Sequence, residues 1–228
     1  MSYVWDSLID LQNHFIKTFD SVATEYKEPG MDRYNHDAWI NRLWSNDDFR
    51  RAHVDVVDAR EEKGLWMMHV CVFPHLSSNA PIYGFDVIAG HKLMTGAFHD
   101  YSPTTEPNHP MIEYFNEQVE PLQWKREREL PPWAKAIFSE KMMAASAVKE
   151  HSEIDQVVST AKKTLDYFVK NVGQYNQNTL RNFVVHAQNG YAHYQKQNPH
   201  TPRVMKTLGL DSDDVDSFIQ KCLFPEVK

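Results

Sequence analysis

Residues Leu65 to Phe73 read Leu-Trp-Met-Met-His-Val-Cys-Val-Phe, and Pro74 follows at once. A short apolar run rich in valine and aromatic residues and closed by proline is typical of a buried strand. One residue does not fit an apolar core: His69 lies in the middle of the run.

Further strand candidates lie on both sides of this run. They share apolar alternation and are separated by short turns: Asp37–Ser45, Phe49–Ala59, Ile82–Ala89, Lys92–Tyr101 and Met142–Val148. We expect a hairpin turn at Glu61–Gly64 and another at Gly90-His91. Strands joined by such short connections predict an antiparallel meander.

Helical spacing of apolar residues covers most of the remaining chain. The ranges with this spacing are 3–19, 110–119, 153–172, 178–197, 201–208 and 213–223. Lys27–Asp37 is expected to be a loop, and Leu130–Trp133 is expected to break the chain because of its paired prolines. We see no linker or internal repeat. The sequence therefore predicts one α+β domain over residues 1–228, with helices flanking an antiparallel sheet.

Composition excludes several classes of protein. The chain has 228 residues, 8 glycines, 2 cysteines and a net charge of −7. It has no apolar run of about 20 residues that could span a membrane, and its acidic start is unlike a signal peptide. It lacks the glycine-rich motifs that bind nucleotides, and two cysteines cannot hold an iron–sulfur cluster. We expect a cytoplasmic protein that binds neither nucleic acid nor membrane.

Basic residues nevertheless cluster in two places, Lys125-Arg126 with Arg128, and Lys162-Lys163. Glu127 and Glu129 interleave the first cluster, as is usual for a solvated surface of mixed charge. The alternative is a docking patch for an acidic partner.

Ionisable residues inside apolar strands are the most informative feature. They are His53, Asp55, His69 and Asp86. A buried imidazole or carboxyl must be hydrogen-bonded or have its pKa shifted. Each residue alone could be a satisfied core group, but four on adjacent strands favour a proton-donating site. Metal binding, with His99, Asp100, His186 and His193 as further candidates, has no convincing ligand spacing. No serine has the context of a nucleophile.

At these residues the chain resembles the ferredoxin-dependent bilin reductases, most closely the phycocyanobilin-forming enzymes. The resemblance covers most of the chain from about Trp39 onward. It rests on these segments: His69–Pro74, Pro81–Ala89, Asp100–Pro103, Arg128–Trp133, Ile137–Ser139, His186–Gly190, His193-Tyr194 and Leu223-Phe224.

The resemblance implies a three-layer α/β/α sandwich with a central antiparallel sheet and a pocket between the sheet and the C-terminal helices. It implies biliverdin IXα as substrate and a radical mechanism in which ferredoxin, a [2Fe–2S] protein, delivers single electrons. It implies no bound flavin, metal or nicotinamide, and we expect a monomer.

The resemblance also implies roles for individual residues. His69 and Asp86 contact the bilin and supply protons, and His53 belongs to the same proton network. The other expected substrate-binding residues are Arg128 and Thr95 at the propionates, Asn198 before the helix at Thr201, His200 and Trp133.

Two positions depart from the phycocyanobilin-forming pattern. Asp55 stands where those enzymes have the glutamate that protonates the D-ring vinyl group, and it is one methylene shorter. His200 stands where a propionate-binding lysine is expected, which would make that anchor dependent on pH. The first departure resembles the viral branch of the family, which makes phycoerythrobilin.

We therefore expect four-electron reduction of biliverdin to phycoerythrobilin through 15,16-dihydrobiliverdin. The alternatives are phycocyanobilin as product, or a bilin carrier without activity. Because ferredoxins are acidic, we expect docking at Lys125, Arg126 and their neighbours, with turnover that falls as salt rises.

Overall fold

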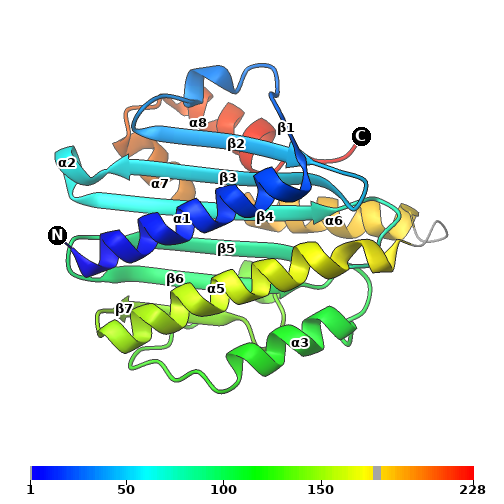
Figure 1. The fold of residues 1–228 in the computed structure, drawn as a ribbon. Coiled ribbons are helices and arrows are strands. Elements are labelled where there is room, and N and C mark those ends of the chain that lie inside the picture. The colour runs from blue at the N-terminus through cyan, green and yellow to red at the C-terminus, as the bar shows by residue number, and fades with distance from the viewer. Residues whose placement is uncertain (1, 177–180) are drawn as a thin grey trace.

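The computed structural model describes residues 2–176 and 181–228. A seven-stranded sheet runs through the middle of it, with the strands in sequence order and each antiparallel to the next (Figure 1). The strands are β1 (Thr24–Tyr26), β2 (Trp39–Ser45), β3 (Phe49–Ala59), β4 (Leu65–Pro74), β5 (Ile82–Ala89), β6 (Met94–Ser102) and β7 (Met143–Val148). The predicted meander is confirmed, and the short edge strand β1 was not predicted.

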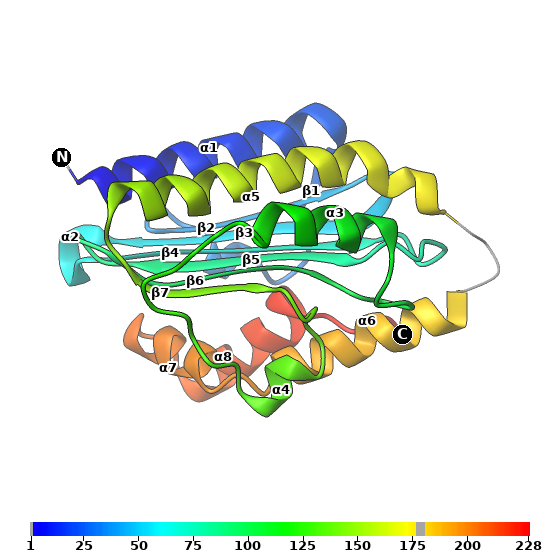
Figure 2. The ribbon, with the colours of Figure 1, turned by 90° about the horizontal axis from the view of Figure 1, so that it is seen from below.

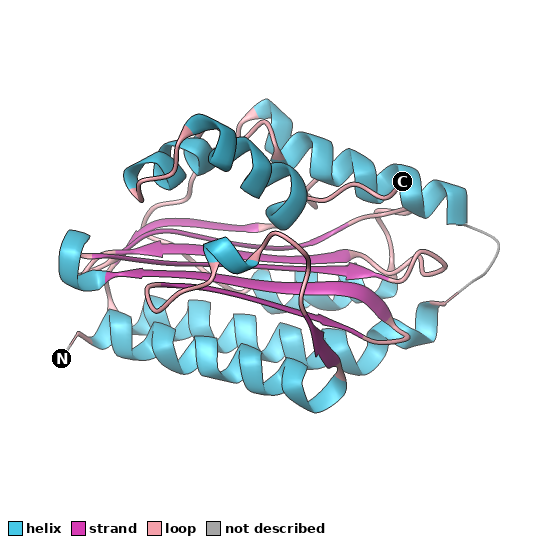
Figure 3. Ribbon diagram, turned by 90° about the horizontal axis from the view of Figure 1, so that it is seen from above, coloured by secondary structure: helices cyan, strands magenta, loops and turns pink. Residues whose placement is uncertain are grey.

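Helices cover both faces of this sheet, which confirms the three-layer sandwich (Figure 2). One face carries α1 (Tyr3–Val22), α3 (Pro110–Val119) and α5 (His151–Asn171). The other carries α4 (Pro132–Lys135), α6 (Arg181–Gln195), α7 (His200–Thr207) and α8 (Ser212–Ser217), which continues as a π-helix, η3 (Phe218–Leu223). Figure 3 shows the second group of helices from the opposite side.

Strand alternation divides the core into two clusters. On β4, Val70 and Val72 pack toward α1 and α5, whereas Cys71 and Phe73 pack toward the C-terminal helices. Successive strand residues point to opposite faces, so a strand buried on both sides needs both clusters. His69 therefore lies on the same face as Cys71, beneath the C-terminal helices.

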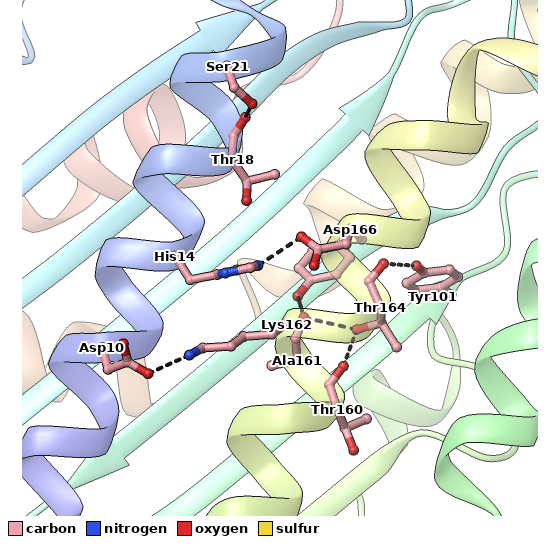
Figure 4. Close-up of polar contacts among 11 residues, drawn as sticks. Asp10, His14, Thr18, Ser21, Tyr101, Thr160, Ala161, Lys162, Thr164 and Asp166 are labelled. Atoms are coloured by element: carbon pink, nitrogen blue, oxygen red, sulfur yellow. Dashed lines mark hydrogen bonds and ion pairs between the residues drawn. The ribbon is translucent and has the colours of Figure 1, made fainter.

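Polar contacts join α1 to α5 on the outer side of the first layer (Figure 4). Lys162 pairs with Asp10, and His14 Nε2 lies 2.8 Å from an oxygen of Asp166. Beneath them Tyr101 on β6 donates to the carbonyl of Thr164. These contacts hold α1 and α5 over one face of the sheet. The candidate site lies on the opposite face.

The structure corrects three local predictions. The expected turn at Glu61–Gly64 is a one-turn helix, α2 (Arg60–Lys63), which Gly64 ends with a φ of 61°. The expected loop at Lys27–Asp37 contains a short 3-10 helix, η1 (Asp32–Tyr34), and a second one, η2 (Val172–Tyr175), follows α5. Pro132 starts α4 rather than only breaking the chain, because proline suits the first helical turn. Part of the helix predicted over 178–197 lies outside the described residues.

Candidate active site

Three ionisable side chains form a row across the sheet. In the strand register Asp55 on β3 is the direct partner of His69 on β4, and His69 is the direct partner of Asp86 on β5. Directly opposed residues have their Cβ atoms about 5 Å apart and on the same face. The register thus brings together three of the predicted site residues, beneath the C-terminal helices.

Asp55 is held firmly from one side. It is 2% exposed, and its Oδ1 accepts a hydrogen bond of 2.6 Å from the indole nitrogen of Trp39. Burial raises the pKa of Asp55 to about 7; the Trp39 hydrogen bond lowers it and the charge of Asp86 raises it further. The carboxyl can therefore carry a proton near neutral pH.

Asp86 and His69 are half-buried and line the same cavity. Burial raises the pKa of Asp86 to about 7, opposed by the positive charge of Arg128. Burial lowers the pKa of His69 to about 4, so its imidazole is neutral at pH 7. His69 Nε2 is buried without a hydrogen-bond partner, and its ring meets Phe224 edge-on at 5.4 Å. In this row the aspartates, rather than the histidine, hold the acidic protons.

A second row lies on the same face of the sheet, two residues along each strand from the first row. It consists of His53, Cys71, Gly84 and Asp100, paired strand to strand. His53 Nε2 lies 2.9 Å from Oδ1 of Asn41, and burial lowers its pKa well below its ordinary value. His53 does not itself line the cavity but supports the strand that carries Asp55.

The rest of the second row shapes the cavity floor. A Cβ at Gly84 would lie 3.1 Å from the hydroxyl of Tyr191 on α6, so glycine lets that ring approach the sheet. Asp100 accepts hydrogen bonds from Ser102, from the Ser139 hydroxyl and from the Ser139 backbone N–H. These bonds tie the segment after α4 to β6.

The cavity between the sheet and the C-terminal helices has about 1050 Å³ of space free of protein atoms, part of it open to solvent. Apolar residues from several elements line it: Met67, Phe85, Ile88, Phe98, Trp133, Phe138, Val204, Met205, Leu223 and Phe224. A large apolar cleft with a few convergent polar groups is the usual form of a site for an organic ligand.

The predicted substrate-binding residues reach the cavity, with one exception. Arg128, Trp133, Asn198 and His200 line it. Arg128 lies over the Phe98 ring at 5.4 Å, with a nitrogen 3.4 Å from His200 Nε2, and Asn198 accepts a hydrogen bond from the backbone N–H of His200. Thr95 is not brought to the cavity: its hydroxyl donates to the carbonyl of Ile88 and the residue is exposed. The register between β5 and β6 shifts beside Ala89, and Thr95 pairs with no residue of β5 there.

The candidates for metal ligation are scattered: Asp100 lies in the second row, and His186 and His193 lie on α6 and do not line the cavity. His99 belongs to the opposite core, where Nδ1 bonds to the carbonyl of Gly84 and Nε2 to Thr164. Within the described residues, no three histidine, cysteine, aspartate or glutamate side chains gather as a metal site would require.

Sequence reasoning missed Trp39 and Tyr191. Trp39 pairs with Val57, and its indole N–H donates to Asp55, two residues away on the neighbouring strand. Nothing in the sequence around a tryptophan at the start of a strand indicates such a diagonal hydrogen bond. Tyr191 was predicted only as an apolar helix position.

The model of the family described as "Ferredoxin-dependent bilin reductase" matches residues 4–225. The chain belongs to the ferredoxin-dependent bilin reductases. It is therefore an oxidoreductase that takes electrons from ferredoxin, and the resemblance seen in the sequence is confirmed.

Two of the relatives by sequence are cyanobacterial enzymes. The chain is 30% identical over 192 residues to phycocyanobilin:ferredoxin oxidoreductase of Synechococcus sp. strain CC9605, covering 81% of this chain and 74% of that one. It is 26% identical over 180 residues to the same enzyme of Prochlorococcus marinus strain MIT 9515, covering 77% and 72%.

Solved structures agree with the fold of this bilin reductase. The structure of PcyX is 34% identical, covers 97% of this chain and 99% of its own, and has a TM-score of 0.73. Phytochromobilin synthase from tomato, solved in complex with biliverdin, has a TM-score of 0.74 at 14% identity and covers 96% and 82%. Among the described helices, none has the length and hydropathy needed to cross a membrane.

Proposed function

We propose that this bilin reductase catalyses the four-electron reduction of biliverdin IXα to phycoerythrobilin, through 15,16-dihydrobiliverdin, as a cytoplasmic monomer of one domain. The observation that carries the proposal is the row of Asp55, His69 and Asp86 across the floor of the cavity. The chain needs no bound cofactor of its own, since ferredoxin delivers the electrons.

The electron and proton counts match such a site. Biliverdin takes up four electrons and four protons to become phycoerythrobilin, in two steps of two electrons and two protons each. A [2Fe–2S] ferredoxin gives one electron at a time, so four reduced ferredoxins are oxidised for each product molecule. Every added electron must be followed by a proton, and Asp86 and Asp55 are acids poised near neutral pH.

We assign the first proton to Asp86 with His69 beside it. Asp86 has no hydrogen-bond partner among the described residues, so its proton is available to a ligand in the cavity. Neutral His69 can pass a proton between its two aspartate neighbours because they flank it in the register. His53, hydrogen-bonded to Asn41, is assigned to the network behind Asp55.

The identity of residue 55 supports the choice of product. Aspartate reaches less far than glutamate, and Trp39 holds one of its oxygens toward β2. A proton donor displaced by about 1 Å can lose about 100-fold in rate. We therefore assign the reductions to the 15,16 methine bridge and the A-ring, and not to the D-ring vinyl group.

The cavity rim supports the orientation of the substrate. Arg128 and His200 lie together at its mouth, and Asn198 fixes the backbone at His200. A guanidinium binds a carboxylate through two parallel hydrogen bonds, so we assign the propionates to this end. Trp133 supplies an apolar wall, and Thr95 keeps at most a peripheral role there.

Ferredoxin docking is assigned to the basic cluster beginning at Lys125 and Arg126. Lys125 is paired with Glu150 at 3.0 Å, and Lys162 of the second cluster with Asp10 (Figure 4). Arg126 is exposed, and no ion pair involves it among the described residues. It is therefore the residue of this cluster best placed to meet an acidic partner.

The test is anaerobic incubation of the purified protein with biliverdin IXα and a ferredoxin kept reduced, followed by absorption spectroscopy. We expect the biliverdin band to bleach and the 15,16-dihydrobiliverdin and phycoerythrobilin bands to appear in turn. A spectrum that shifts on mixing but does not change under reduction would contradict the proposal. It would indicate a protein that binds bilin without reducing it.

A further inference from the structure

The indole of Trp39 is placed to control Asp55. Trp39 opens β2 and pairs with Val57, so Asp55 is its diagonal neighbour on β3 and both side chains lie on one face. Aromatic side chains are long enough to bridge such a diagonal. The indole N–H donates to Asp55 Oδ1 at 2.6 Å, and both residues are almost fully buried, at 3% and 2% exposure.

Two further rings fix the direction of this hydrogen bond. Phe218 of η3 meets the indole edge-on, with ring centroids 4.7 Å apart, and Tyr34 of η1 lies at 5.6 Å. Edge-on aromatic pairs restrict rotation of the packed ring. The N–H is thus held toward β3 by segments from opposite ends of the chain.

The chemistry of the indole makes the two oxygens of Asp55 different. An indole nitrogen only donates, so Oδ1 is always an acceptor. When Asp55 is protonated, its proton must be on Oδ2. No other hydrogen bond involves the Asp55 side chain within the part of the chain that the structure describes, and the residue lines the cavity.

We propose that Trp39 is the positioning residue that makes Asp55 a proton donor of fixed orientation, by occupying Oδ1 and leaving the acidic proton on Oδ2 for a ligand in the cavity. The catalytic part rests on the proposed function. Among the described residues no equivalent donor reaches Asp86, so the two acids of the row act differently: one is fixed and the other is free to turn.

Several titratable groups are packed around Asp55, and any that ionise near pH 7 would affect its titration curve. They are His53 on β3, His69 on β4, Asp86 on β5, Cys222 in η3 and Tyr34 behind the indole. Burial keeps both histidines neutral near pH 7 and raises the pKa of Cys222 to about 12. Of these groups, only Asp86 titrates in the same range as Asp55, so the two carboxyls are followed together.

The first measurement uses the substrate-free protein and carbon-13 NMR of its aspartate carboxyls, with the Asp55 signal assigned by its loss in Asp55→Asn. Trp39→Phe removes a donor to the ionised form, so the pKa of Asp55 is expected to rise by about one unit. An unchanged or lowered pKa would overturn the proposal, whatever happens to turnover.

The chain offers a matched control on the same strand. Trp44 is also fully buried, and its indole N–H donates to an aspartate, Asp20, at 2.9 Å, but on the opposite face of the sheet. Trp44→Phe therefore removes the same group and is expected to leave the Asp55 titration unmoved. If Trp39→Phe fails to fold, Phe218→Leu loosens the indole and is expected to shift the pKa in the same direction, by less.

The second measurement is the pH profile of bilin turnover. A protonated Asp55 is lost as pH rises, so the alkaline limb is expected to move up with the NMR pKa in Trp39→Phe, while the maximal rate falls about tenfold. If the NMR pKa of Asp55 shifts in Trp39→Phe but the alkaline limb of the pH–rate profile does not, Trp39 still positions Asp55. The proton-donor role of Asp55 in the proposed function is then what fails.

Discussion

His69 and Asp86 are direct partners across β4 and β5, and both face the cavity. We expect Asp86→Asn to keep the cavity and lose the acid, because an amide has nearly the same shape but no proton to give at neutral pH. Turnover should fall at least about 100-fold. A biliverdin difference titration should show an affinity within a few-fold of wild type; undiminished turnover would remove Asp86 from the mechanism.

Asp55 should make stability depend on pH in a defined direction. Its pKa is raised in the folded protein, so the folded state holds a proton that the unfolded state has released between about pH 4 and pH 7. The contribution of Asp55 to the free energy of unfolding therefore falls as pH rises through this window.

Comparison with Asp55→Asn isolates this contribution from the opposing histidines. The variant should gain about 1–3 kcal/mol relative to wild type between pH 4 and pH 8 in urea unfolding without substrate. A stability difference that stays flat with pH would show that Asp55 titrates normally.

The opposite core offers a prediction independent of the site. His99 donates from Nδ1 to the carbonyl of Gly84, so its Nε2 accepts from the hydroxyl of Thr164, which is fully buried. Thr164→Val keeps the shape and leaves that nitrogen unsatisfied, at a cost of about 1–3 kcal/mol. Chemical unfolding measures the loss. A cost below about 0.5 kcal/mol, which is the usual scatter of surface substitutions, would contradict the assigned bond.

The assignment of ferredoxin docking to Arg126 can be tested by charge reversal, with Lys162 as the control. Arg126→Glu should raise the KM for ferredoxin severalfold at low ionic strength, with a smaller effect at high salt because surface charges are screened. Lys162→Glu breaks the pair with Asp10 and should affect stability instead (Figure 4). Equal effects of both variants on this KM would discard the Arg126 assignment.

The sequence predicted those parts of the structure that depend on local pattern. The alternation in Phe49–Ala59 and the apolar run at Leu65–Phe73 predicted the strands, and strand order then placed Asp55, His69 and Asp86 on adjacent strands. A meander leaves little choice of neighbouring strand, but the register that makes the three residues direct partners was seen only in the structure.

Contacts between distant segments were beyond such reasoning. The approach of Tyr191 to Gly84 depends on how α6 lies on the sheet, and the indole of Trp39 is fixed by Phe218 from near the C-terminus. Thr95 lies at an irregularity in strand register, where it pairs with no residue of β5. Each is a result of tertiary packing and leaves no periodic signal in the sequence.

The final pigment shows which double bonds of biliverdin the protein reduces. Biliverdin IXα is reduced to completion by the wild-type protein and by Asp55→Glu with the same reduced ferredoxin, and the products are separated by chromatography against standards. We predict phycoerythrobilin from the wild type and a gain of exovinyl-reduced product from Asp55→Glu. Phycocyanobilin as the sole product of the wild type, unchanged in Asp55→Glu, would show that Asp55 does not select the product.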